Sequence, residues 1–383
     1  MDMEVFINDL AAFLPHSPVD NEHIEEVLGR IKNVPSRVKK LVLRNNKIQN
    51  RYYALDPETG ELTHNNAQLT ARAIERLSPY PGFTLQDIQC LACGTSCGDL
   101  LLPGHALMVL GELGIPQCEA VSTHGICISG MTAFKYALMN VKSGFSDNAV
   151  ATGSELASSF MRSRFFSEQE RVDSDMEKRP ELAFDTDFLR WMLSDGAGAA
   201  FLSSTQNPDA ISLRVDWMEN ISYAGILETC QYAGGVKKED GTVVGWRVLE
   251  SLSEEEYKHI FAVKQDIKLL DREIVRTAID FALRQVIAKY QLTPESIDWF
   301  LPHYSSHYFR DKFYNRMKEV GFEIPEDRWF TNLYSKGNTG SAAPYIIMEE
   351  LFHSGKLQKG QKLLCFIPES GRFSHCYMML TAV

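Results

Sequence analysis

Short apolar runs of strand length alternate with segments of helical apolar spacing along most of this 383-residue chain. Such alternation predicts an α/β protein in which helices are layered on sheets through right-handed crossovers. The expected strands are 5–7, 87–92, 118–122, 148–153, 195–202, 297–301, 363–367 and 377–380, and the expected helices are 21–29, 66–77, 105–113, 128–142, 275–290 and 345–351.

The chain divides into two halves with a similar order of elements, 1–205 and 206–383. A polar stretch from about Asn207 to Asp271 opens the second half and is expected to be irregular. Because this length exceeds one simple core, one large domain or two fused halves is expected. The similarity suggests an internal duplication, although no repeat is visible at the level of single residues.

Charge and cysteine content narrow the classes of function. A net charge of -11 and a pI near 5.5 argue against nucleic acid as the main partner. Asp2, Glu4 and Asp9 interrupt the N-terminal apolar residues, so no secretion signal is expected, and no run approaches the roughly 18 apolar residues that span a bilayer. Eight scattered cysteines are typical of reduced thiols. We therefore expect a soluble, cytoplasmic protein that does not bind membranes.

The segment 124–130 reads His-Gly-Ile-Cys-Ile-Ser-Gly and joins an expected strand to an expected helix. A thiol at a helix N-terminus faces the positive end of the helix dipole, which lowers the thiol pKa and favours thiolate. Cys127 is thus a candidate nucleophile toward a thioester carbonyl. The structural alternative is a small buried hydrophobic residue, which is the commoner role of a lone cysteine.

Two polar side chains of the second half, His303 and Asn338, are also candidate site residues because of their positions. His303 comes directly after the expected strand 297–301, at the end where α/β proteins gather their sites. Asn338 lies in a Gly-Asn-Thr-Gly turn before a helix and could direct its amide donors at a developing enolate. As isolated features they could equally be a loop histidine and a helix cap. His307 suggests a metal pair with His303, but no third ligand has suitable spacing, so no metal is expected.

Taken together, Cys127, His303 and Asn338 resemble the Cys, His and Asn triad of the β-ketoacyl-acyl carrier protein synthase III group of the thiolase superfamily. The resemblance covers nearly the whole chain, and it implies a duplicated five-layered α/β/α/β/α fold and a homodimer whose loop 97–103 approaches the partner's pocket. Further matches are the arginine-flanked segment 44–51, Gly-Thr-Ser at 94–96, Gly-Ser-Glu at 153–155 and Asp-Gly-Ala-Gly-Ala at 195–199.

The chain departs from the housekeeping members of that group at two places. Tyr-Ser-Ser follows His303 in place of the usual Gln-Ala-Asn, and Pro-Glu-Ser-Gly-Arg-Phe at 368–373 replaces a glycine-rich turn. With segments 42–48, 51–55 and 66–70, this last stretch is similar to ketosynthases that make dialkylresorcinol or stilbene precursors. That resemblance implies joining of two acyl thioesters and closure to a 1,3-cyclohexanedione in secondary metabolism.

Glu155 lies just past an expected strand and is the candidate base for such a ring closure. A surface or interface glutamate is the alternative. Arg44 and Arg51 are expected to form a basic patch that binds the phosphopantetheine of a coenzyme A or acyl carrier protein donor. The cysteines of 90–97 lie on an expected buried strand, whose side chains alternate in direction, and are interpreted as packing.

The expected activity is a transacylation onto Cys127 followed by carbon–carbon bond formation, with no cofactor beyond the thioester substrates. Three alternatives stay open. The first is a synthase III of fatty-acid initiation. The second is a papain-like Cys-His-Asn hydrolase, although the signature around its cysteine and a secretion signal are missing. The third is a ketosynthase-like subunit without activity, although such subunits usually lack the nucleophile.

Overall fold

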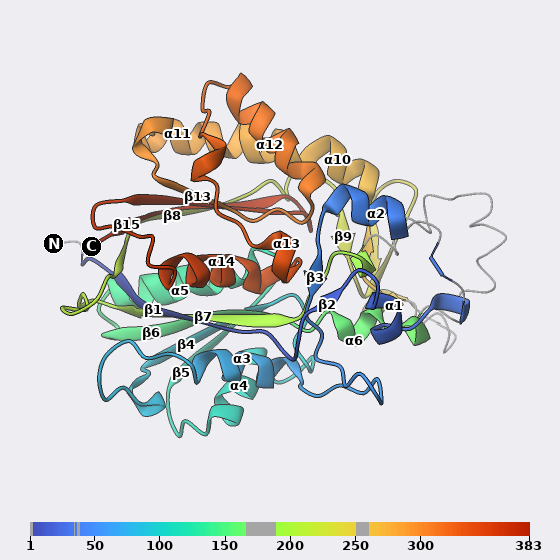
Figure 1. Ribbon diagram of the computed structural model, residues 1–383, viewed down its shortest axis with the longest axis horizontal. Coiled ribbons are helices and arrows are strands. Elements are labelled where there is room, and N and C mark those ends of the chain that lie inside the picture. Colours follow the sequence, from blue (N-terminus) through green and yellow to red (C-terminus); the bar gives the residue numbers. More distant parts are fainter. Residues whose placement is uncertain (1–2, 34, 37–38, 166–188, 250–259) are drawn as a thin grey trace.

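The computed structural model describes residues 3–33, 35–36, 39–165, 189–249 and 260–383. Two layers of strands alternate with three layers of helices, as the side view in Figure 1 shows. This is the predicted α/β/α/β/α arrangement. None of the described helices combines the length and apolar character needed to cross a membrane.

The first sheet layer comes from the N-terminal half. Its strands are β1 (Phe6–Phe13), β4 (Cys90–Thr95), β5 (Glu119–His124), β6 (Asn148–Glu155) and β7 (Gly196–Ser203). They lie in the order β5-β4-β6-β7-β1, where β4 pairs in parallel with β5 and β6, while β7 runs antiparallel to β6 and β1.

The second sheet layer repeats this succession. Its strands are β8 (Leu213–Ser222), β13 (Trp299–Pro302), β14 (Lys362–Glu369) and β15 (Ser374–Ala382), in the order β13-β14-β15-β8. As with β4-β6-β7-β1, the first pair is parallel and the next two pairs are antiparallel. A short β1–β8 pairing at Phe6 and Ile7 joins the two layers. An internal duplication would produce this repeated order of parallel and antiparallel pairs. The boundary between the halves at 205/206 stays a prediction.

Helices cover both outer faces and fill the space between the sheets (Figure 1). The helices α3 (Asn66–Ile74) and α4 (His105–Leu113) cover the first sheet. On the second sheet lie α10 (Ile267–Val275), α11 (Arg284–Tyr290) and α12 (His307–Glu319). The central layer holds α5 (Ser129–Lys142) and α14 (Ala343–Phe352), whose apolar residues share one core with strands of both sheets.

Close packing in the central layer fixes the turn that carries Asn338. A Cβ on Gly153 of β6 would lie 2.1 Å from the carbonyl oxygen of Ser341, so only glycine lets the turn approach this strand. Phe134 of α5 is fully buried in the same layer, where burial of its ring stabilises the fold by about 2–3 kcal/mol. The Tyr345 hydroxyl of α14 donates to the carbonyl oxygen of Gly130 at 2.7 Å. The N-termini of the two central helices are therefore held together.

The prediction of an irregular segment at about 207–271 is wrong near its start. Residues 213–222 form β8, a ten-residue strand that pairs with β15 and joins the half-sheets. Buried Leu213 and Val215 alternate with Arg214 and Asp216, but this strand pattern is short, because the pairing with β15 shifts register after Val215 and the alternation breaks at Trp217-Met218. Residues 250–259 of that segment lie outside the described part. The helix expected at 275–290 begins earlier, because α10, a π-helical turn and α11 continue from one to the next.

Candidate active site

Cys127 lies in the loop between β5 and α5, two residues before the first residue of the helix, and is 7% exposed. The expectation that the helix terminus leaves its sulfur as thiolate is wrong for this structure. Burial raises the pKa of the thiol well above its usual range, and the nearby carboxylates of Glu369 and Glu155 raise it further. Burial and these two carboxyls therefore favour the neutral thiol over the thiolate.

His303 emerges at the carboxyl end of β13, as predicted, and its backbone N–H donates to the carbonyl oxygen of Phe366 at 2.8 Å. Its imidazole is buried, and burial lowers its pKa to about 4. The ring nitrogen Nε2 is buried and has no hydrogen-bond partner among the described residues. A neutral imidazole with one unpaired nitrogen can exchange a hydrogen bond with a substrate oxygen.

Cys127 and His303 line one cavity. Its remaining wall is mostly apolar and aromatic and is formed by Leu270, Ile274, Tyr304, Ser305, Phe309, Phe313, Pro368 and Ser370. Side chains of α10 and α12 therefore face the sulfur across the cavity. An apolar wall beside a thiol and an imidazole suits an acyl chain that carries a reactive carbonyl.

Asn338 is buried in the turn before α14. Its backbone bonds to Met192 and Ser194, and its side-chain Oδ1 accepts the Gly340 N–H at 2.9 Å. The amide nitrogen Nδ2 is thereby left as the donor that can serve a ligand. Asn338 does not line the cavity, but its turn reaches the start of α5, where Ser129 Oγ and Ser341 Oγ are 3.0 Å apart.

Glu155 is the last residue of β6 and is buried, which differs from the surface position considered for it. Its Oε1 accepts the backbone N–H of Ser341 at 3.0 Å and the hydroxyl of Ser96 at 2.5 Å. Burial raises the pKa of this carboxyl to about 7. Glu155 does not line the cavity, although its charge acts on the Cys127 thiol.

Glu369, which was not predicted from the sequence, lies near the same sulfur. It is the last residue of β14, it is buried, and burial raises the pKa of its carboxyl. Its oxygens accept the backbone N–H groups of Gly371 at 2.7 Å and Ser374 at 3.2 Å. The strand-end position that singled out Glu155 applies equally to Glu369 and was a usable signal.

The structure separates the two arginines of the expected basic patch. Arg44 is exposed in the last turn of α2 (Lys39–Asn46). Arg51 is fully buried, and its guanidinium donates to the carbonyl oxygen of Trp191 and, at 2.6 Å, to Oδ1 of Asn21. The Arg51 guanidinium is thus occupied by acceptors of the fold, and burial lowers its pKa to about 10.

Metal-ligating side chains do not gather in the described part of the chain, where no three of His, Cys, Asp and Glu are grouped to hold an ion. His307 binds instead to protein partners, because its Nε2 lies 2.7 Å from Lys47 Nζ and its Nδ1 2.6 Å from the Tyr334 hydroxyl. Cys90 and Cys93 lie on β4 and are buried in different apolar clusters, in agreement with the packing interpretation. That interpretation is wrong for Cys97, which lies beyond the end of β4 and is exposed.

Two family models match the segments that carry these residues. The N-terminal domain of beta-ketoacyl synthases matches residues 117–207, which include Cys127 and Glu155. The C-terminal domain of 3-oxoacyl-[acyl-carrier-protein] synthase III matches residues 287–367, which include His303 and Asn338.

Whole-chain comparisons agree with these matches. The beta-ketoacyl-[acyl-carrier-protein] synthase III of Clostridium perfringens is 23% identical over 352 residues, which are 92% of this chain and 91% of the relative. The tetronic acid condensing enzyme AbyA1 superposes with a TM-score of 0.74 at 19% identity over 98% of this chain and 99% of its own. Xanthomonas campestris OleA, solved with lauric acid and lauroyl-CoA, superposes with a TM-score of 0.73 at 17% identity over the full length of both chains. The fold is thus that of the thiolase-like condensing enzymes.

Proposed function

We propose that the chain is a condensing acyltransferase of the ketosynthase III type in which Cys127 accepts the acyl group. The observation that carries the proposal is that Cys127 and His303 open onto one cavity with an apolar wall. In the loading step the sulfur bonds to the thioester carbonyl carbon, the bond to the carrier sulfur breaks, and the carrier leaves as a thiol with the proton of Cys127. Coenzyme A and acyl carrier protein thioesters are the proposed donors, with the exposed Arg44 as a candidate phosphate contact.

His303 and Asn338 serve the bond-forming half-reaction in this proposal. Loss of carbon dioxide or of an α-proton from a second thioester produces an enolate. The Asn338 amide donor and His303 Nε2 suit its oxygen, because both groups are neutral and neither donates a hydrogen bond to a described residue. The enolate carbon then attacks the acyl carbon on Cys127, whose sulfur leaves.

For a β-ketoacyl second substrate, the proposal extends to ring closure and a dialkyl 1,3-cyclohexanedione. The supporting feature is Glu155, a buried carboxyl whose pKa of about 7 lets it take a proton near neutral pH. Fatty-acid initiation is the second candidate, since the matched curated relative carries the name synthase III. A malonyl thioester as the preferred second substrate would favour initiation.

Intact-protein mass spectrometry with acyl thioesters tests the nucleophile. Wild type should gain the mass of one acyl group and Cys127→Ala none. Cys118→Ala is the matched control, because Cys118 is a partly exposed thiol outside the cavity and its loss should leave loading unchanged. An adduct retained by Cys127→Ala would overturn the assignment.

Product analysis with a loaded enzyme and a β-ketoacyl thioester tests the ring closure. Wild type should release a cyclic dione, whereas Glu155→Gln should still condense the two substrates and release a linear product. Linear product from wild type would refute cyclisation without affecting the nucleophile.

A homodimer is part of the proposal. Strand β5 lies at the edge of the sheet and so leaves backbone groups unpaired on one side. Three nearby leucines are largely exposed: Leu100 at 52%, Leu101 at 74% and Leu102 at 82%. Such an apolar patch in contact with water is unfavourable and is unusual on a monomer. Light scattering of wild type should give twice the chain mass. Leu101→Glu should lower the measured mass toward that of one chain. A monomeric wild type would contradict the dimer.

A further inference from the structure

The two half-sheets place one carboxyl each at corresponding strand ends. Strand β6 follows β4 in the first layer as β14 follows β13 in the second, and each of these parallel pairs is flanked by an antiparallel strand. Glu155 is the last residue of β6, and Glu369 is the last residue of β14. Both carboxyls are buried, so the repeat brings two acidic groups to the region of Cys127.

Glu369 lies against the loop that carries the nucleophile. A Cβ on Gly371 would come within 2.1 Å of Glu369 Oε1 and within 2.8 Å of Ile126 Cδ1, so both side chains reach the same point in space. Ile126 is the residue before Cys127. The neighbours of Glu369 on either side, Pro368 and Ser370, line the cavity.

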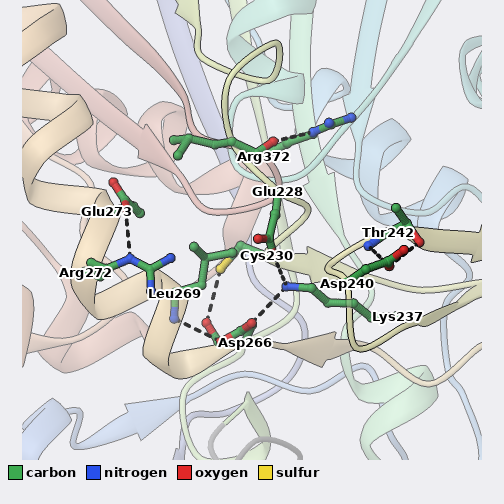
Figure 2. A network of polar contacts seen from close by, with 11 residues as sticks. Glu228, Cys230, Lys237, Asp240, Thr242, Asp266, Leu269, Arg272, Glu273 and Arg372 are labelled. Carbon is green, nitrogen blue, oxygen red and sulfur yellow. Dashed lines mark hydrogen bonds and ion pairs between the residues drawn. The ribbon is translucent and has the colours of Figure 1, made fainter.

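The turn after Glu369 is held in place by the segment 223–231. The backbone N–H groups of Cys230 and Gln231 donate to the carbonyl oxygen of Gly371 at 2.9 and 3.2 Å, and the Ser370 hydroxyl donates to the side chain of Gln231 at 2.8 Å. Cys230 is in turn tied to Asp266, just before α10, through both of their backbones and its sulfur. Figure 2 shows this second connection. The position of the carboxylate is therefore fixed by contacts on both sides.

Cations near this carboxylate are engaged elsewhere. The Arg372 side chain donates to the carbonyl oxygen of Leu227, and Lys237 forms ion pairs with Glu228 and Asp266 (Figure 2). Within the described ranges, Glu369 has backbone N–H partners and no ion pair.

The titratable groups that face Cys127 are Glu369, Glu155 and the neutral His303. Those that face Glu369 are Cys127 and Cys230. A negative charge without a counter-ion disfavours a thiolate beside it. No positive side chain of the described residues offsets that effect at the sulfur.

We propose that Glu369 is a positioning residue whose carboxylate keeps the Cys127 sulfur protonated while the cavity is empty. The proposal rests on Cys127 being the nucleophile. Thiolate then forms only together with acyl transfer, when the thiol proton passes to the departing carrier sulfur. The free enzyme is thereby protected from alkylation and oxidation, whose rates depend on thiolate.

The pH profile of Cys127 alkylation by iodoacetamide, followed by peptide mass spectrometry, tests this role. Glu369→Gln removes the charge, so the midpoint of the profile should fall by about one pH unit and alkylation at neutral pH should become on the order of tenfold faster. Glu369→Ala should do the same, which covers the case that an amide fits the turn poorly. Unchanged midpoints in both folded variants would overturn the proposal.

Two controls separate charge from structure. Glu369→Asp keeps the charge and should keep the wild-type midpoint, so an equal shift in this variant would show a merely structural effect and refute the role. Glu219→Gln removes a carboxylate paired with Lys289 and remote from the cavity, and it should change nothing. Alkylation reports the state of the sulfur without any acyl donor. A failure of acyl loading would therefore overturn the proposed function, whereas the alkylation profile would still test the role of Glu369 separately.

Discussion

Glu155 and Glu369 occupy corresponding ends of two repeated sheets, but the protein holds them in different ways. Glu155 accepts hydrogen bonds from Ser96 and Ser341, which belong to different halves of the chain. Glu369 accepts only from the hairpin turn that directly follows it. The repeat therefore accounts for where the carboxyls lie, while the surrounding loops determine what each can do. Glu155 thus connects the two halves by hydrogen bonds, whereas Glu369 acts on its local electrostatic surroundings.

Substitution of the glycines beside the two carboxyls, Gly340 and Gly371, should give the largest difference in the free energy of unfolding. A Cβ on Gly340 would lie 2.8 Å from Glu155 Cγ, and the residue has a φ of 51°, so Gly340→Ala should lower the free energy of unfolding by about 3–4 kcal/mol. The Cβ of Gly371→Ala would meet only side-chain atoms, of Glu369 and Ile126, and the position needs no positive φ, so the cost should be smaller, about 1 kcal/mol. Urea denaturation measures both, and the opposite ranking would break the comparison.

The second-largest effect is expected in the pH dependence of stability, to which the raised pKa of Glu155 should contribute. The folded protein keeps its proton up to about pH 7, whereas the unfolded chain loses it near 4.5, so this group's contribution is present below pH 4.5 and is lost as the pH rises to 7. Glu155→Gln should therefore gain roughly 3 kcal/mol relative to wild type between these pH values. Denaturation of both proteins across this range measures the difference, in which the buried histidines cancel. A constant difference would show that Glu155 is already ionised in the folded state.

Combining the two substitutions asks whether the carboxyls act on the sulfur independently. In Glu155→Gln/Glu369→Gln the alkylation midpoint of Cys127 should fall by the sum of the single shifts, about one pH unit for each. Peptide mass spectrometry at several pH values gives the midpoints. A double variant that behaves like Glu369→Gln alone would restrict control of the thiol to the C-terminal half.

The smallest effect is expected at the serines. Ser96→Ala removes a hydroxyl that stabilises the charged form of Glu155, so the pKa of that carboxyl should rise by a fraction of a unit, or about 0.5–1 kcal/mol. Ser370 bonds to Gln231 and not to Glu369, so Ser370→Ala should leave the state of both carboxyls unchanged. The pH dependence of ring closure, for which Glu155 is the proposed base, measures the first, and an equal shift in both variants would argue against specific hydrogen bonding.

Much of the fold followed from local patterns. The helix 105–113 and the strand ends at Glu155 and His303 were accessible because apolar spacing and turn residues act over a few positions. Strand β8 was missed because the apolar alternation of its first residues breaks at Trp217-Met218, where the pairing with β15 shifts register. Its pairing depends on β1 and β15, which lie far away in the sequence.

The candidate site was predictable in its residues and not in its electrostatics. Cys127, His303 and Asn338 were selected by motif and context, and the structure confirms that the first two share a cavity. The protonation of the sulfur was predicted wrongly. A helix terminus is visible in the local sequence, whereas a carboxyl from position 369 comes near only after both halves have folded. Burial of Arg51 escaped prediction for the same reason.

The seam at β1 has a consequence for how substrate preference can change. Phe6 and Ile7 align the sheet that carries the sulfur with the sheet that carries the imidazole. The cavity wall comes from α10, α12, the loop between β13 and α12, and the end of β14 with the turn after it, none of which contributes to that seam. Mutations can therefore remodel the wall for longer or branched chains while the reacting groups keep their alignment, which leaves this scaffold open to diversification.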